Sequence, residues 1–202
     1  YCIDRLYPEL KDSTSPYLDL LESVMDLQIN LISQWLSVGF IHGVMNTDNT
    51  SISGETIDFG PCAFMEKFNP NQVFSAIDQQ GRYSYSNQPQ ILHWNLMRLA
   101  EALLLLFDTD EKKAVEKAES VFEGYWSKFN SIWSSVMLKK MGISETQEGD
   151  VALVHEFMDL MHASKSDFTL SFRLLSHRLS GVPFPVAVDV PLFKTDQIKN
   201  WE

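Results

Sequence analysis

The stretch HGVMNTDN, residues 42–49, is followed after a short gap by DFG, residues 58–60. It lies within FIHGVMNTDN, residues 40–49, which shows no helical periodicity, so we predict that residues 40–49 form a loop. The segment before it, SPYLDLLESVMDLQINLISQWLSVGF, has apolar residues at helical spacing. Ser15 suits the N-cap of this helix, Pro16 its first turn and Gly39 its end. The loop is therefore expected to follow a long helix.

The chain after the loop is predicted to form a hairpin, a long loop and then helices. TSISGETID, residues 50–58, alternates around Gly54-Glu55, which predicts a short β-hairpin. Residues 59–87 are rich in Gly, Pro, Asn and Gln and are expected to form a long ordered loop. The first predicted helix after this loop is 89–107, and the second is capped by Thr109 and runs to Met141 with a break near Asn130. The third has a capping box of Ser144 and Gln147 and runs to Ala163, and the fourth is 167–179. A short last helix is predicted after GVPFPVAVDVP, which cannot be helical.

This order of elements indicates a fold class. Helix, loop, hairpin, long loop and then helices is the order of the C-terminal lobe of a protein-kinase-like (α+β) fold. We therefore expect residues 1–202 to form one such lobe, mainly α with a small β-hairpin.

The two motifs also match a spacing. The catalytic loop of protein kinases reads His-x-Asp, four residues, Asn, and then Asp-Phe-Gly a little downstream. His42, Asn49 and Asp58 stand at these spacings, whereas Val44 occupies the position of the catalytic Asp. A single Asp-Phe-Gly carries little information, and an Asp-Asn pair often serves a turn through bonds to its own backbone. The joint pattern favours a site that handles ATP.

The loop supplies groups that phosphate chemistry needs. Phosphoryl and nucleotidyl transfer require metal ions that gather charge on the phosphates and a group that orients the incoming hydroxyl. Asn49 and Asp58 are the predicted metal ligands, because Mg²⁺ or Mn²⁺ prefers hard oxygen atoms, and Asp58 would hold ATP through the metal. Val44 can do neither task, and Asp48 is the only carboxylate in the loop. His42 is expected to be structural, packing and bonding backbone to hold the loop.

The composition excludes several classes of protein. The hydrophobic fraction of 45% and charged fraction of 21% are those of an ordinary soluble globular protein. The net charge of −11 argues against a general nucleic-acid binder, which needs basic patches. The longest apolar run, residues 102–107, is far too short to span a bilayer. Cys2 and Cys62 give no disulfide framework, which favours a reduced, intracellular protein.

The sequence resembles the selenoprotein O family, the YdiU group. The segments that carry the resemblance are WLSVGFIHGVMNTDNTSISGETIDFGPCAFM, GRYSYSNQP and WNLMRLAEAL, and the similarity extends over all 202 residues. It implies a kinase-like fold and a pseudokinase that transfers AMP from ATP to Ser, Thr or Tyr hydroxyls of proteins. The nucleotide would bind inverted, with its α-phosphate facing the acceptor. The resemblance also implies that Asp48 is the catalytic residue, the proton acceptor for the attacking hydroxyl.

Some parts of a kinase-like protein are missing from the sequence. We find no glycine-rich phosphate loop and no strand lysine paired with a helix glutamate, which belong to the N-terminal lobe and would precede Tyr1. The C-terminal end of the family, with its selenocysteine or cysteine, is also missing. We therefore expect a fragment without the N-lobe and the C-terminal tail, with little activity by itself, from a bacterial cytoplasm or a mitochondrion.

Two other functions stay open. One is a phosphotransferase of the kinase type, against which Val44 speaks, and the other is a non-catalytic pseudokinase module that binds partners. Arg82 in GRYSYSNQP could hold acceptor or phosphate, or could anchor the loop. The histidines without metal-site spacing, read as solvated or core residues, are His93, His155, His162 and His177.

Overall fold

The computed structural model describes residues 1–184 and 189–201 and consists mainly of helices. At its centre α2 (Pro16–Val38) packs against α3 (Gln88–Phe107) and α5 (Tyr125–Lys140). The other elements are α1 (Cys2–Leu6), β1 (Phe40–Ile41), β2 (Ala63–Phe64), α4 (Glu111–Phe122), α6 (Asp150–Ala163), α7 (Phe168–Ser180), α8 (Asp196–Trp201) and the short 3-10 helices η1 (Pro8–Asp12), η2 (Thr47–Asn49), η3 (Tyr85–Asn87) and η4 (Pro191–Lys194).

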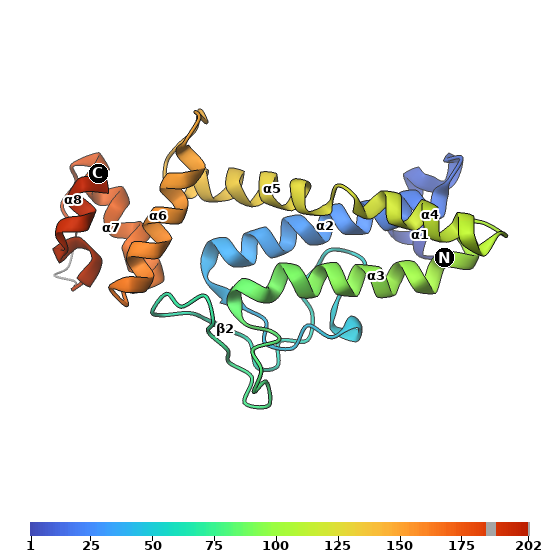
Figure 1. The fold of residues 1–202 in the computed structure, drawn as a ribbon, viewed down its shortest axis with the longest axis horizontal. Coiled ribbons are helices and arrows are strands. Elements are labelled where there is room, and N and C mark those ends of the chain that lie inside the picture. Colours follow the sequence, from blue (N-terminus) through green and yellow to red (C-terminus); the bar gives the residue numbers. More distant parts are fainter. Residues whose placement is uncertain (185–188, 202) are drawn as a thin grey trace.

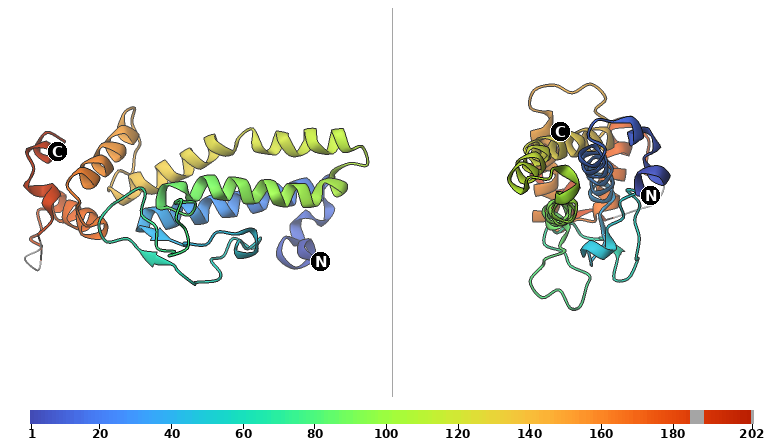
Figure 2. Two further views of the ribbon diagram at one scale, coloured as in Figure 1. Left: turned by 60° about the horizontal axis from the view of Figure 1, so that its bottom comes forward. Right: turned by 90° about the vertical axis from the view of Figure 1, so that its right-hand side faces the viewer.

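The helices form an elongated body, as Figure 1 shows, with α6, α7 and α8 gathered at the end far from the N-terminus. The long connection between α2 and α3 lies on the side of these two helices away from α5 (Figures 1 and 2). Residues 42–60 belong to this connection and are presented on one face of the body. No helix in the described part of the chain is long and apolar enough to cross a membrane.

Helix α2 forms as its apolar period predicts. Pro16 lies in its first turn, and Gly39 ends it in the left-handed conformation with φ of 71°, so both expectations are confirmed. Ser15 is the flanking residue, but its side chain makes no capping hydrogen bond. The buried side chains recur every three or four residues and make the face of the core: Leu21, Met25, Ile29, Ile32 and Leu36.

A two-stranded antiparallel sheet is present, but not where the sequence predicted it. The hairpin expected over residues 50–58 does not form; β1 pairs with β2 instead, with Phe40 opposite Phe64 and Ile41 opposite Ala63. The predicted loop therefore begins with a strand, and its later part contains η2. The pairing brings the two ends of the segment from His42 to Cys62 together, so this segment forms a closed loop.

Local side-chain bonds explain why residues 50–58 do not pair. The hydroxyls of Ser51 and Ser53 lie 2.7 Å apart, and the Ser53 hydroxyl donates to the Glu55 carboxylate at 2.8 Å. Such bonds compete with a strand ladder. Gly54, with φ of 74°, lies directly on α2, where an added Cβ would come within 2.7 Å of Leu27 Cβ. Residues 50–58, whose alternating pattern predicted a hairpin, therefore form a turn that packs against α2.

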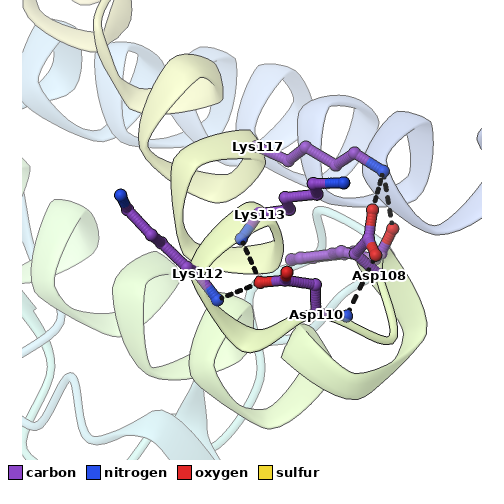
Figure 3. A network of polar contacts seen from close by, with 6 residues as sticks. Asp108, Asp110, Lys112, Lys113 and Lys117 are labelled. Carbon is purple, nitrogen blue, oxygen red and sulfur yellow. Dashed lines mark hydrogen bonds and ion pairs between the residues drawn. The ribbon is translucent and has the colours of Figure 1, made fainter.

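The corner between α3 and α4 is fixed by carboxylates, as Figure 3 shows. Asp110, not the predicted Thr109, is the N-cap of α4, because its carboxylate accepts from the backbone N–H groups two and three residues further on. Lys117 donates to the Asp108 carboxylate at 2.8 Å. This bond, together with the backbone N–H of Asp110, lowers the pKa of Asp108 to about 2.

The long helix predicted to end at Met141 is broken earlier than expected. The break lies at Glu123 and Gly124, between α4 and α5, and α5 is continuous through Asn130. Glycine is a poor helix former, which accounts for the position of the break.

The start of α6 also differs from the prediction. The capping box of Ser144 and Gln147 does not form, and the helix begins at Asp150 after Gly149. The Asp150 carboxylate accepts from the backbone N–H of Gln147 at 2.7 Å, so the acid inside the helix supplies the local bond.

The last helices agree with the sequence. Asp167 caps α7, where its carboxylate accepts from the backbone N–H of Leu170, and α8 is the expected short final helix. Of the segment predicted to be non-helical, residues 185–188 lie outside the described residues, and its described parts are not helical before η4. That residues 1–202 form a kinase-like lobe stays a prediction.

Phe168 joins the last helices to the loop region. Its side chain is fully buried, and its backbone N–H donates to Glu66 O at 2.6 Å. Its ring lies against Gly39, where an added Cβ would stand 2.9 Å from ring carbon Cδ1. Two features therefore favour glycine at the end of α2, namely the left-handed backbone and the contact with the Phe168 ring.

We expect Gly39→Ala to lower the free energy of unfolding by about 2 kcal/mol or more. The left-handed conformation costs a residue with a Cβ roughly 1–2 kcal/mol, and the clash with Phe168 adds to it. Urea unfolding of the purified protein measures the change.

Gly181→Ala is the matched control, because Gly181 also ends a helix, has φ of 69° and has nothing within 4 Å of an added Cβ. It should show the backbone cost alone. Equal losses in the two variants would mean that the Phe168 contact contributes nothing.

Candidate functional site

His42 fixes the start of the loop. Its side chain is fully buried, and Nε2 donates to the carbonyl of Ile57 at 2.7 Å. The ring stacks on Trp35 of α2, with centroids 5.4 Å apart and planes 15° apart. Trp35 Nε1 also donates to Thr56 Oγ1 at 2.9 Å. The structural role expected for His42 is confirmed. Its bond to Ile57 restrains the residue directly before Asp58.

Gln88 at the start of α3 also holds the beginning of this loop. Its side chain is fully buried; Oε1 accepts from the backbone N–H of His42 and Nε2 donates to Phe40 O, both at 3.1 Å. An amide satisfies a donor and an acceptor at once, and buried backbone groups need both. Gln88 thereby sets the position of the chain where β1 passes into the loop.

Two more buried amides hold the later part of the loop. Asn95 of α3 donates to Met45 O at 3.1 Å and to Thr50 Oγ1 at 2.8 Å. Gln28 of α2 donates to Ser51 O at 2.5 Å. The segment from Met45 to Ser51 is therefore fastened at both ends to the helices beneath it.

Between these anchors lie Asp48 and Asn49 of η2. Asn49 Nδ2 donates to Val44 O at 2.9 Å, which leaves its carbonyl oxygen without a partner among the described residues. Asp48 is exposed, and its carboxylate has no hydrogen-bond or ion-pair partner in that part of the chain. One residue thus offers a free amide oxygen, and its neighbour offers a free carboxylate.

Asp58 stands on the returning arm of the loop. It is exposed, and its carboxylate has no partner within residues 1–184 and 189–201. Its φ is 55°, so it is one of two described non-glycine residues with positive φ, and its carbonyl accepts from Gly60 N–H at 2.8 Å. Backbone strain of this kind clusters at functional sites and persists only where the surroundings enforce it.

The structure brings the two arms of the loop together. They leave the β1–β2 pair on the same side, and His42 bonds Ile57 across them. Gly43, with φ of 85°, approaches Pro61 so closely that an added Cβ would stand 3.1 Å from the Pro61 carbonyl oxygen. The arm with Asp48 and Asn49 and the arm with Asp58 therefore belong to one restrained unit. That Asn49 and Asp58 share an ion stays a prediction.

The donor set fits a metal that is shared with phosphate groups. The described residues contain no cluster of three or more His, Cys, Asp and Glu side chains that could hold a metal without other ligands. Asn49 and Asp58 offer free hard oxygens, which suits Mg²⁺, an ion that takes one or two protein ligands together with substrate phosphates and water.

The other candidates named from the sequence lie elsewhere or have local roles. Arg82 is exposed and lies over the Trp94 ring, 4.9 Å from its centroid, while the neighbouring Tyr83 donates to Asn46 Oδ1 at 2.5 Å. The segment GRYSYSNQP therefore touches the loop. The histidines make packing or backbone contacts: His93 with Tyr125 and Trp126, His155 with Trp133, His162 with Phe68 O and His177 with Val182 O.

Sequence reasoning missed Gln28, Gln88 and Asn95. All three are buried polar residues on helix faces that are otherwise apolar. An amide at such a position costs free energy unless it is bonded, and this was the signal that could have identified them.

Comparisons with known proteins agree with the resemblance. A family model described as protein adenylyltransferase SelO matches residues 1–186. A relative from Agrobacterium fabrum, named protein nucleotidyltransferase YdiU, is 52% identical over 90% of this chain and 37% of its own length. Relatives of the same name from Shouchella clausii (50% identical; 100% of this chain, 41% of its own) and Rhizobium johnstonii (54%; 87% and 35%) are similarly close. The chain spans only 35% to 41% of the length of these relatives. From the family match and these identities, the chain belongs to the SelO family.

Proposed function

We propose that this chain carries the catalytic loop of an ATP- and metal-dependent protein adenylyltransferase, which transfers AMP to Ser, Thr or Tyr hydroxyls of other proteins. The observation that carries the proposal is the pair Asp48 and Asn49, a free carboxylate beside a free amide oxygen on an anchored loop. Relatives named nucleotidyltransferases support it. The activity belongs to the whole protein, of which we infer that residues 1–202 form a kinase-like C-terminal lobe.

Asn49 and Asp58 would hold the metal ion. Mg²⁺ or Mn²⁺ bound there would gather the charge of the ATP phosphates and stabilise the charge that develops during transfer. The hydrogen bond from Asn49 Nδ2 to Val44 O fixes which end of the amide faces outward. The restraint of Ile57 by His42 keeps Asp58 beside the loop despite its exposure.

Asp48 would act as the general base. Its carboxylate takes the proton from the acceptor hydroxyl while the hydroxyl oxygen forms a bond to the α-phosphorus. The bond from the α-phosphorus to the bridging oxygen breaks, and pyrophosphate leaves with that oxygen. Val44 cannot accept a proton, so the base of this loop stands four residues later than in kinases.

The product of the reaction tests the proposal. The full-length protein is incubated with ATP and Mg²⁺ together with acceptor protein, and label is supplied as α-³²P-ATP or γ-³²P-ATP. We expect label on protein from the α position only and a mass gain of one AMP. Label from the γ position alone would identify a phosphotransferase, and no metal-dependent turnover would identify a non-catalytic module.

The roles of the two acids should separate in variants. Asp58→Asn keeps the shape and the tolerance for positive φ but removes the charge, so we expect both metal-dependent ATP binding and transfer to be lost. Asp48→Asn should keep ATP binding and lower turnover by roughly 10²–10⁴. Calorimetric titration measures binding, and single-turnover assays measure transfer.

Glu119→Ala is the control for loss of an exposed carboxylate, because Glu119 lies on α4 and should leave both quantities unchanged. Near-normal turnover with Asp48→Asn would assign the base to another group.

The Gln88 anchor should matter for turnover without any contact to substrate. Gln88→Leu leaves His42 N–H and Phe40 O without their partner, which costs roughly 1–3 kcal/mol for each buried group. We expect a lower melting temperature and at least about a 100-fold loss of turnover, because misplacement of about 1 Å has an effect of that size.

Gln90→Leu is the matched control, since Gln90 is exposed on the same helix and should change neither quantity by much. Gln88→Glu keeps the size of the side chain and serves where the leucine variant does not fold. Full turnover in a folded Gln88 variant would contradict the positioning role.

A further inference from the structure

A pocket adjoins the loop on the side of α3. Its volume is about 430 Å³, within the range of roughly 300–1,000 Å³ that holds small ligands and single side chains of partners. Most of its lining residues are apolar, and the polar ones come chiefly from the loop. The lining residues are Val24, Thr47, Thr50, Ser51, Ile52, Trp94, Asn95, Leu96, Arg98, Leu99 and Ala102.

Residues close in sequence to the proposed base line the pocket. Thr47 and Thr50 line it, and Asp48 and Asn49 stand between them in the chain. An acceptor hydroxyl must reach Asp48, so the polypeptide that carries it must pass this edge of the loop. An extended chain advances about 3.3 Å per residue, so a side chain two or three positions from the hydroxyl can enter the pocket.

Cationic side chains gather at Trp94 on the pocket wall. Arg98 lies over the Trp94 ring at 5.2 Å from its centroid, and Arg82 lies over it at 4.9 Å. Arg98 also pairs with Glu101 at 2.6 Å, an exposed contact that leaves most of its N–H groups available. Stacking on an aromatic ring holds a guanidinium in place without using its hydrogen-bond donors.

The overall charge makes these arginines distinctive. The chain has a net charge of −11, so its surface in general repels acidic segments. Arg98 at the rim is a local exception, and a carboxylate there would gain a charge-assisted hydrogen bond. The charge that opposes such a ligand comes from Glu101 and from Asp48.

We propose that this pocket is the acceptor subsite, in which an apolar side chain of the substrate protein enters the cavity and a neighbouring acidic side chain pairs with Arg98. The inference rests on the proposed function, because it assigns the selection of acceptor proteins to the same loop. Two observations favour a substrate protein with an acidic side chain as the occupant. Arg98 is a positive charge in a chain of net charge −11, and the pocket is lined by residues on either side of Asp48 and Asn49 in the sequence.

The test compares two fluorescent peptides with the full-length protein. Both carry one Ser and one Leu three positions away, and the residue beside the Leu is Asp in one peptide and Lys in the other. Fluorescence polarisation measures peptide binding, and AMP transfer is assayed separately. We expect the Asp peptide to bind more tightly to the unmodified protein and to be the better acceptor.

Two variants examine the two parts of the subsite. Arg98→Glu should invert the preference, weakening the Asp peptide by at least about fivefold and favouring the Lys peptide. Ala102→Phe fills the pocket from an exposed position and should weaken both peptides. Lys112→Glu on α4 is the matched charge control and should preserve the preference of the unmodified protein.

The outcomes separate the two ideas. Unchanged preference in Arg98→Glu together with unchanged affinity in Ala102→Phe would overturn the subsite. Absence of binding of either peptide to the unmodified protein, as when another segment of the longer protein covers the pocket, would also overturn it. Selective peptide binding without AMP transfer would support the docking surface and reject the proposed transfer.

Discussion

The buried amide of Gln88 is the contact on which the loop depends. It bonds the backbone N–H of His42 and the carbonyl of Phe40, so it fixes the chain at the point where β1 becomes the loop. The contact works because α3 is itself held against α2, the central helix of the body. Tyr125 of α5 strengthens this arrangement by donating to Pro89 O at 2.7 Å, in a site whose burial raises the pKa of the phenol. The position of the loop therefore depends on how α2, α3 and α5 pack.

From that fixed point the restraint passes to Asp58. His42 donates to Ile57 O, Trp35 supports the ring of His42 and bonds Thr56, and Gly43 lies against Pro61. These contacts enforce a left-handed Asp58, a conformation that costs free energy and survives only in a well-determined environment. The exposed acid is therefore presented by a rigid support. The same logic explains Asp48 and Asn49, which are free at their side chains while Asn95 and Gln28 hold the segment at both ends.

Side chains without partners on a hydrogen-bonded loop would suit the proposed phosphate chemistry in an acidic protein. A net charge of −11 gives no general attraction for ATP, so the proposed phosphate site would need metal ions or local cations. The free oxygens of Asn49 and Asp58 suit the first requirement. The stacked arginines at Trp94 lie beside the loop and offer local positive charge on the side of the pocket. The two features would act on different ligands, one on nucleotide and one on acceptor.

The sequence by itself determined the family and most of the helices, and it predicted the site residues, which stay a prediction. The 3.6-residue period of α2, Pro16 at its start and Gly39 at its end are local signals, and local signals can be read without a structure. The spacing of His42, Asn49 and Asp58 is also a local pattern, and the site predicted from it rests on that spacing. Tertiary structure decided the strand pairing and the anchors. Phe40 pairs with Phe64 rather than within residues 50–58, because Ser51, Ser53 and Glu55 bond one another and Gly54 rests on α2. Gln88 and Asn95 meet the loop across 46 and 50 residues of sequence, and such long-range bonds depend on how α2 and α3 pack, which no local pattern records.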